Sequence, residues 1–91
     1  MLIALMAHDK PDALQTRQDN RPAHLEHLKT HAKIVAQAGP LLNDAGEMAG
    51  SLIILDVPDM ATAQTFADTD PYAVAGLFAS VTLTEWKRVI G

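Results

Sequence analysis

The apolar residues of this chain fall into short runs that are typical of β-strands. Residues 2–7 form a continuous apolar run, which is typical of a strand buried on both faces. Residues 41–46 predict a short strand that enters a turn at residues 47–50, and residues 51–57 are the clearest strand of the sequence. The last strand is expected within residues 77–90, where apolar and polar positions alternate. The alternating positions are Val81 and Leu83 against Thr82, Thr84 and Trp86.

Between the first two runs, apolar residues recur at helical spacing. Asp12 is expected to cap a short helix, with Gln15 three residues later completing a capping box. Residues 19–22 interrupt this pattern, and a second helix is expected to run to Ala38, where Gly39-Pro40 stops it. The apolar positions of that helix are Leu25, Leu28, Ala32 and Val35, and His24 lies at the edge of their arc.

A third helical pattern follows the clearest strand. Pro58 ends that strand, and Asp59 is expected to cap the helix. Asp70-Pro71 marks a turn, because a residue before proline is pushed out of the helical region. Residues 72–76 are then expected to form one helical turn. The buried side of the third helix is expected to consist of Met60, Ala63, Phe66 and Ala67.

The elements therefore follow the order strand, helix, strand, strand, helix, strand. This order predicts an α+β, ferredoxin-like βαββαβ fold, in which a four-stranded antiparallel sheet carries the helices on one face. We expect residues 1–91 to form a single domain with a thin core and a partly apolar uncovered sheet face. The chain has no cysteine for a disulfide, so we expect a homodimer to supply the missing stability.

The composition narrows the partners that this chain is expected to bind. Hydrophobic residues make up 48% of the chain and charged residues 20%, as in compact rather than disordered proteins. A formal net charge of −4 and an aromatic content of 4% offer neither a basic surface nor stacking platforms for nucleic acid. The apolar residues 1–7 lack a basic lead-in and are too short for a signal peptide or a membrane span. We expect a cytoplasmic protein with no nucleic-acid or membrane partner.

The two side chains that say most about function lie close to two prolines in the sequence. His24 follows Pro22 in the first turn of the expected long helix, and Asp70 precedes Pro71 on a tight turn. An imidazole titrates near neutral pH, and a neighbouring carboxylate fixes its tautomer and raises its basicity. If the fold brings the two side chains together, His24 is a base that Asp70 orients. If it does not, they are a helix-surface histidine and a turn former.

Five further residues are candidates for binding a substrate. Arg17 and Arg21 could anchor an anionic or phenolate oxygen, or pair with surface carboxylates. Tyr72 is either a proton donor at the site or the apolar anchor of its turn. Ser51 begins a strand outside any nucleophile-elbow motif, so we interpret it as a hydrogen-bond donor rather than a hydrolase nucleophile. His8, at the end of the first strand, could line the same pocket.

A metal site is the weaker interpretation of the histidines. His24, His27 and His31 are spaced i, i+3 and i+7, and two imidazoles one turn apart can share a metal ion. The three positions spread over about 60° of the helix, however, and no His-Glu-x-x-His pattern is present. The sequence also shows no nucleotide-binding loop. We therefore expect no metal and no cofactor.

Short segments spread in order across nearly the whole chain match one protein family. They are Asp9-Lys10, Arg17, Arg21-Pro22-Ala23-His24-Leu25, Ala38-Gly39-Pro40, Gly50-Ser51, and Ala67-Asp68-Thr69-Asp70-Pro71-Tyr72 followed by Ala75-Gly76. On these residues the sequence resembles the YciI-like proteins of the YCII-related family, within the dimeric α+β barrel group of ferredoxin-like folds. The connection from Leu42 to Ser51 is shorter than in many relatives, which alters the rim of the expected pocket.

The resemblance implies a homodimer whose sheets face one another, with a pocket in each subunit. It also implies that His24 and Asp70 are the family's His–Asp active-site pair. Some relatives are lyases that eliminate hydrogen chloride from hydroxylated rings. Other members of the wider barrel group are isomerases, monooxygenases or dehydratases that act on small cyclic compounds.

Two main functions remain open at this point. The first is a cofactor-independent enzyme in which His24, held by Asp70, moves a proton on a small cyclic or phenolic compound, by elimination or isomerisation. Arg21 or Ser51 would stabilise the developing oxyanion. The second is a non-catalytic binding or accessory protein that holds a small metabolite in the same pocket. A metal-dependent variant that uses His24 with His27 or His31 is a third.

Overall fold

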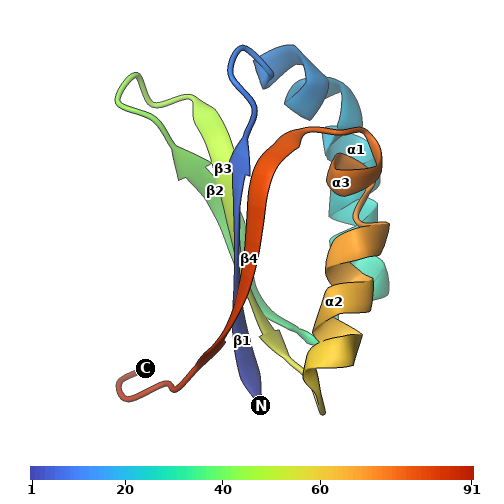
Figure 1. The fold of residues 1–91 in the computed structure, drawn as a ribbon, viewed down its shortest axis with the longest axis vertical. Coiled ribbons are helices and arrows are strands. Elements are labelled where there is room, and N and C mark those ends of the chain that lie inside the picture. Colours follow the sequence, from blue (N-terminus) through green and yellow to red (C-terminus); the bar gives the residue numbers. More distant parts are fainter.

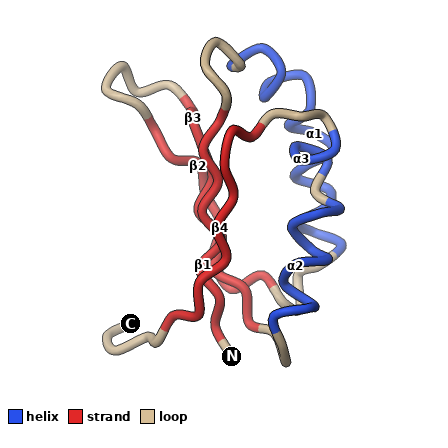
Figure 2. The backbone as a smooth tube through the Cα atoms, viewed as in Figure 1, coloured by secondary structure: helices blue, strands red, loops and turns tan.

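The computed structural model describes all 91 residues and contains four strands and three helices. The sheet and the helices form two layers (Figures 1 and 2). In chain order the elements are β1 (Leu2–Asp9), α1 (Leu14–Thr30), β2 (Val35–Leu42), β3 (Met48–Asp56), α2 (Met60–Thr69), α3 (Pro71–Val74) and β4 (Phe78–Trp86). The predicted ferredoxin-like order is confirmed, and α3 lies where one helical turn was expected, at residues 72–76.

The four strands form one antiparallel sheet in the order β2-β3-β1-β4. The central strand β1 pairs with both β3 and β4, so that Leu5 lies opposite Ile53 on one side and Leu83 on the other. The pairing with β4 shifts register between His8 and Asp9, as at a β-bulge. The helices lie together on one face of this sheet (Figure 1).

The core fills the space between the sheet and the helices. It combines alternate residues of β1 and β3 with the inner side of α2. Its buried members are Ile3, Leu5, Ala7, Ile53, Leu55, Val57, Ala63, Phe66 and Ala67. None of the helices is long and apolar enough to cross a membrane.

The other face of the sheet carries apolar residues that no part of the chain covers. Met6 and Leu52 lie directly opposite one another there, and each is 37% exposed. Trp86 of β4 is on the same face, opposite Leu2, and is 39% exposed. Within one chain, β1 is therefore buried on one face only, and the expectation of burial on both faces is not met.

Helix α1 differs most from the sequence-based expectation. It continues through Pro22 as one helix instead of breaking at residues 19–22, and it ends at Thr30 rather than Ala38. An interior proline costs about 3 kcal/mol, so tertiary packing on both sides of it must compensate. Arg17 and His24 are both buried, and seven residues place them on the same side of the helix.

The segment after α1 is strand, not helix. Val35 is the first residue of β2, and Gly39-Pro40, expected to stop the helix, lie inside that strand. Proline is tolerated because β2 is an edge strand, where one side of the ladder needs no partner. The hairpin turn falls at residues 43–47 instead of 47–50, and β3 begins at Met48.

The two predicted helix caps have different outcomes. Asp59 caps α2 by accepting a hydrogen bond from the Thr62 N–H at 2.8 Å, and bonds from Thr62 lower the pKa of this carboxyl. Asp12 does not cap α1, which follows Ala13 without any side-chain cap. Asp12 has a φ of 57°, the left-handed conformation that aspartate tolerates in turns.

The buried side of α2 differs from the expectation at one position. Met60, expected to be buried there, is 38% exposed.

Candidate active site

The fold brings His24 and Asp70 into direct contact although they are 46 residues apart. The Nδ1 atom of His24 lies 2.9 and 3.0 Å from the two carboxylate oxygens of Asp70, and both residues are buried. Asp70 also caps α3, where its Oδ1 accepts the Tyr72 N–H at 2.9 Å. The carboxylate is therefore fixed from two sides. With Nδ1–H donating to it, the lone pair of the imidazole is on Nε2.

Tyr72 forms the wall behind the imidazole. Its ring stacks on His24 with centroids 4.0 Å apart and planes 16° from parallel. The guanidinium of Arg17 lies 4.5 Å from the centroid of the same ring, a cation–π distance. Burial raises the pKa of the Tyr72 hydroxyl, which has no hydrogen-bond partner. The Tyr72 ring therefore contacts both the imidazole and the guanidinium.

Arg17 belongs to a buried charged network with Asp9 and Ser51. Its Nε and Nη2 donate to the Asp9 carboxylate at 2.7 and 2.8 Å, and Nη2 also donates to the Ser51 Oγ at 3.0 Å. Burial alone would lower the pKa of Arg17, but the bonds and charge of Asp9 outweigh it, and the pKa is raised. Arg17 is therefore a fixed cation whose charge Asp9 already balances.

Arg21 is held much more loosely than Arg17. Its Nη1 donates to the thioether sulfur of Met48 at 2.8 Å, and no carboxylate lies within ion-pair distance of it. A thioether is a weak acceptor, so the guanidinium keeps most of its capacity to bind an anionic oxygen.

These side chains line a small cavity between α1 and strands β2 and β3. Its volume is about 100 Å³. Arg17, Arg21, His24 and Ser51 supply its polar wall, and apolar groups of the helix and sheet supply the rest. The remaining lining residues are Leu25, Leu28, Ala38, Gly39, Pro40 and Ile53. We call this cavity the inner pocket.

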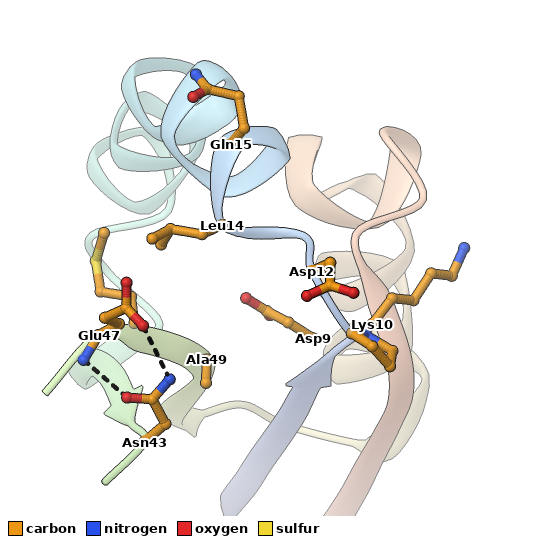
Figure 3. A pocket seen from close by; sticks show the side chains of 10 residues that line it. Asp9, Lys10, Asp12, Leu14, Gln15, Asn43, Glu47 and Ala49 are labelled. Carbon is orange, nitrogen blue, oxygen red and sulfur yellow. Dashed lines mark hydrogen bonds between the residues drawn. The ribbon is translucent and has the colours of Figure 1, made fainter. Parts of the chain in front are cut away.

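A larger cavity of about 500 Å³ lies between the β2–β3 hairpin and the segment that leads into α1 (Figure 3). We call it the outer chamber. Asn43 and Glu47 are joined across the hairpin on one side, where the Glu47 N–H donates to the Asn43 Oδ1 at 3.0 Å. The full lining is Asp9, Lys10, Pro11, Asp12, Leu14, Gln15, Asn43, Glu47, Met48 and Ala49.

Three of the four histidines lie outside this site. His8 is exposed on the opposite face of the sheet, paired with Gly50, so the fold does not bring it to the inner pocket. His27 donates from Nε2 to the Phe66 carbonyl at 3.1 Å, and His31 donates from Nδ1 to the His27 carbonyl at 2.9 Å. Burial lowers the pKa of His27. No set of three metal-ligating side chains gathers anywhere in the chain.

Ser51 donates no hydrogen bond to His24. It is bonded to Arg17, and the acidic partner of His24 is Asp70, so these residues do not form a serine-hydrolase triad.

The glycine before Ser51 allows the two central strands to approach closely at the site. A Cβ at Gly50 would stand 2.5 Å from the Ala7 carbonyl oxygen, so only glycine lets β3 approach β1 this closely.

The comparison with known families identifies the chain. The model of the YCII-related domain matches residues 1–87. The chain belongs to the YCII-related family. Protein YciI of Escherichia coli O6:H1 is 36% identical, with 98% of this chain and 99% of that protein covered. An uncharacterized protein of Haemophilus influenzae is 29% identical over 98% of this chain and 99% of its own.

Among solved structures, the chain is similar to 5-chloro-2-hydroxyhydroquinone dehydrochlorinase (TftG) from Burkholderia phenoliruptrix AC1100, in complex with 2,5-dihydroxybenzoquinone. The TM-score is 0.88 and the identity 34%, with 96% of this chain and 94% of that chain covered. A structure named as an antibiotic biosynthesis monooxygenase of Bacteriodes thetaiotaomicron has a TM-score of 0.62 at 12% identity, covering 99% of this chain and 90% of its own. That second likeness shows the fold alone.

Asp9 and Met48 contact the site residues Arg17 and Arg21, although no sequence motif predicted a role for either. The alternation of β1 carried a signal for Asp9, because it continues the buried positions Ile3, Leu5 and Ala7 onto the helix side of the sheet. A carboxylate at that position needs a buried cation, which Arg17 supplies. Met48 carried no such signal, since its contact depends on where the hairpin folds.

Proposed function

We propose that this YCII-related protein is a cofactor-independent acid–base enzyme that acts on a small hydroxylated ring, by elimination or isomerisation. The observation that carries the proposal is the buried His24–Asp70 pair at the wall of a pocket that also holds Arg17, Arg21 and Ser51. The likeness to a dehydrochlorinase bound to a dihydroxybenzoquinone supports the substrate class.

In an elimination, His24 would take a proton through Nε2 from a hydroxyl of the ring's keto tautomer, in which the carbon that bears the leaving group is tetrahedral. The O–H electron pair forms a new C=O bond, the ring double bond shifts toward that carbon, and the leaving group departs with its own bonding pair, which leaves a quinone. Asp70 stabilises the imidazolium that results, because its carboxylate lies 2.9 Å from Nδ1. General base catalysis of this kind contributes about 10²- to 10⁴-fold to a rate.

Arg21 and the Arg17–Ser51 pair would act on the oxygens of the ring. A hydroxylated ring that loses a proton gains negative charge on oxygen, and Arg21 has no carboxylate to compete for its donors. Arg17 is already paired with Asp9, so its role is to orient Ser51 and one substrate oxygen. The expected substrate is therefore an anionic or phenolic compound.

We further propose that the protein works as a homodimer. The exposed apolar side chains of Met6, Leu52 and Trp86 lie together on the uncovered face of the sheet. A second copy that packs face to face against this surface would remove it from water, which is the largest stabilising contribution available to so small a chain.

The test is chloride release from 5-chloro-2-hydroxyhydroquinone by wild type, His24→Ala and His31→Ala. His31 is a matched control because it lies outside the inner pocket. We expect His24→Ala to lose at least about 100-fold in turnover while its oligomeric state stays that of wild type. Turnover retained in His24→Ala would overturn the acid–base role. A ligand that binds through His24 but is never transformed would favour a binding protein.

A further inference from the structure

The inner pocket and the outer chamber meet at two side-chain contacts. Asp9 lines the chamber and is bonded to Arg17, which lines the pocket. Met48 lines the chamber and is bonded to Arg21, which lines the pocket. These two pairs join the lining of the cavity that contains His24 to the lining of the larger cavity beside the hairpin.

The inner pocket is too small for the ligand class that its chemistry suits. Its volume is about 100 Å³. A protein cavity of about 150 Å³ holds a single benzene molecule, and hydroxyl groups add to that requirement. A hydroxylated ring therefore enters only if part of the wall moves.

The two contacts differ in what holds them. Arg17 makes two short charge-assisted bonds to Asp9 and a third to Ser51, so moving it would leave a buried carboxylate unpaired. Arg21 is half-buried and held only through the Met48 thioether, a weak acceptor on a flexible side chain. The Arg21–Met48 contact is therefore the part that opens at least cost.

We propose that the inner pocket and the outer chamber form one binding site, joined when Arg21 and Met48 separate. This inference rests on the proposed function for the ring in the inner pocket. The chamber adds a subsite for a polar substituent of that ring, because Asn43 and Glu47 line its hairpin side. Met48 then determines the size of the ligand that reaches His24, and the Arg21 guanidinium, released from sulfur, turns to the ligand's anionic oxygen.

The experiment measures how fast diethyl pyrocarbonate modifies His24 in the whole protein, residue by residue, by mass spectrometry. This reagent acylates an accessible, unprotonated imidazole nitrogen and needs no substrate. His31, half-exposed at the end of α1 and outside the inner pocket, is the internal standard in every sample. The variants are Met48→Ala, which removes the contact, and Met48→Phe, which fills the opening. Met60→Ala, at an exposed methionine of α2, is the matched control.

We expect Met48→Ala to accelerate the modification of His24 relative to His31 by about fivefold, the change that corresponds to losing one ordinary hydrogen bond. Met48→Phe should slow it, and Met60→Ala should leave it unchanged. A His24 rate that is the same in both Met48 variants as in wild type would overturn the proposal. Acceleration in Met60→Ala as well would also overturn it, because access would then follow general loosening. The modification rate is measured without any substrate turnover. This test and the chloride-release test can therefore fail separately.

Discussion

Tyr72 lies stacked on His24 with ring centroids 4.0 Å apart, and its hydroxyl is buried without a hydrogen-bond partner. The ring and the hydroxyl therefore have opposite effects on stability. The ring packs both His24 and Arg17, whereas the hydroxyl has lost its water without gaining a partner. A buried polar atom of this kind is often retained where a ligand supplies the missing bond.

The Tyr72 substitutions separate these two effects. Tyr72→Phe keeps the stack and removes the unpartnered hydroxyl, so we expect it to be at least as stable as wild type. Tyr72→Leu loses the stack and leaves a cavity, and should cost roughly 2 kcal/mol or more of the free energy of unfolding. Urea unfolding followed by circular dichroism measures both. A Phe variant as unstable as the Leu variant would mean that the hydroxyl has a partner in solution.

Removing one partner of the buried Asp9–Arg17 pair should lower the free energy of unfolding more than removing both. Asp9→Asn leaves the guanidinium buried without its counter-charge and should cost about 3–5 kcal/mol. The double variant Asp9→Leu with Arg17→Met removes both charges and should recover most of that loss. The comparison is made by denaturant unfolding of the three proteins. A double variant less stable than Asp9→Asn would contradict this account of the pair.

A substitution at Gly50 should destabilise the protein, because β1 and β3 approach closely there. Gly50→Ala would place a Cβ 2.5 Å from the Ala7 carbonyl oxygen, so the strands must separate. We expect a loss of about 1–3 kcal/mol and a displaced Ser51. Gly39→Ala is the control, since nothing lies within 4 Å of a Cβ there and its backbone needs no special conformation. Equal melting temperatures for the two variants would show that the close approach is not maintained.

Protonation of His27 should account for part of the loss of stability at acidic pH. Burial lowers its pKa in the folded state, so below pH 7 the unfolded chain binds this proton more readily than the folded one. The contribution of His27 is therefore complete above its unfolded pKa of about 6.5 and is lost as the pH falls through the folded value.

His27→Gln keeps a donor for the Phe66 carbonyl but cannot titrate. Its urea midpoint should fall less than that of wild type between pH 7 and pH 5. His31→Gln serves as the comparison on a neighbouring histidine. If His27→Gln and wild type lose stability in parallel, another group accounts for the acid sensitivity.

The fold was largely predictable because its strands are short apolar or alternating runs and proline or glycine signals fall between most elements. The errors lie where tertiary packing overrides local signals. Pro22 stays inside α1 because Arg17 and His24 pack on either side of it, and Gly39-Pro40 joins a strand because that strand is at the edge of the sheet. Neither choice is visible in local propensity.

Some residues of the site were predicted from the sequence and others were not, again because contacts between distant segments decide their positions. The juxtaposition of His24 and Asp70 was expected, and the structure places them in contact. His8 was expected near the same pocket, but strand alternation puts it on the other face, one position out of phase with Ala7. The role of Met48 followed only from the folded hairpin, because its contact with Arg21 spans 27 residues of sequence.

The most direct test of the account is nitrogen-15 NMR of the histidine rings, recorded for wild type and Asp70→Asn at neutral pH. The geometry predicts that neutral His24 carries its proton on Nδ1, bonded to Asp70, and that Nε2 is free to act as the base. Loss of the carboxylate should change this tautomer while the signals of His8 and His31 stay as they were. A His24 ring protonated on Nε2 in wild type, or one that ignores Asp70→Asn, would contradict the acid–base role.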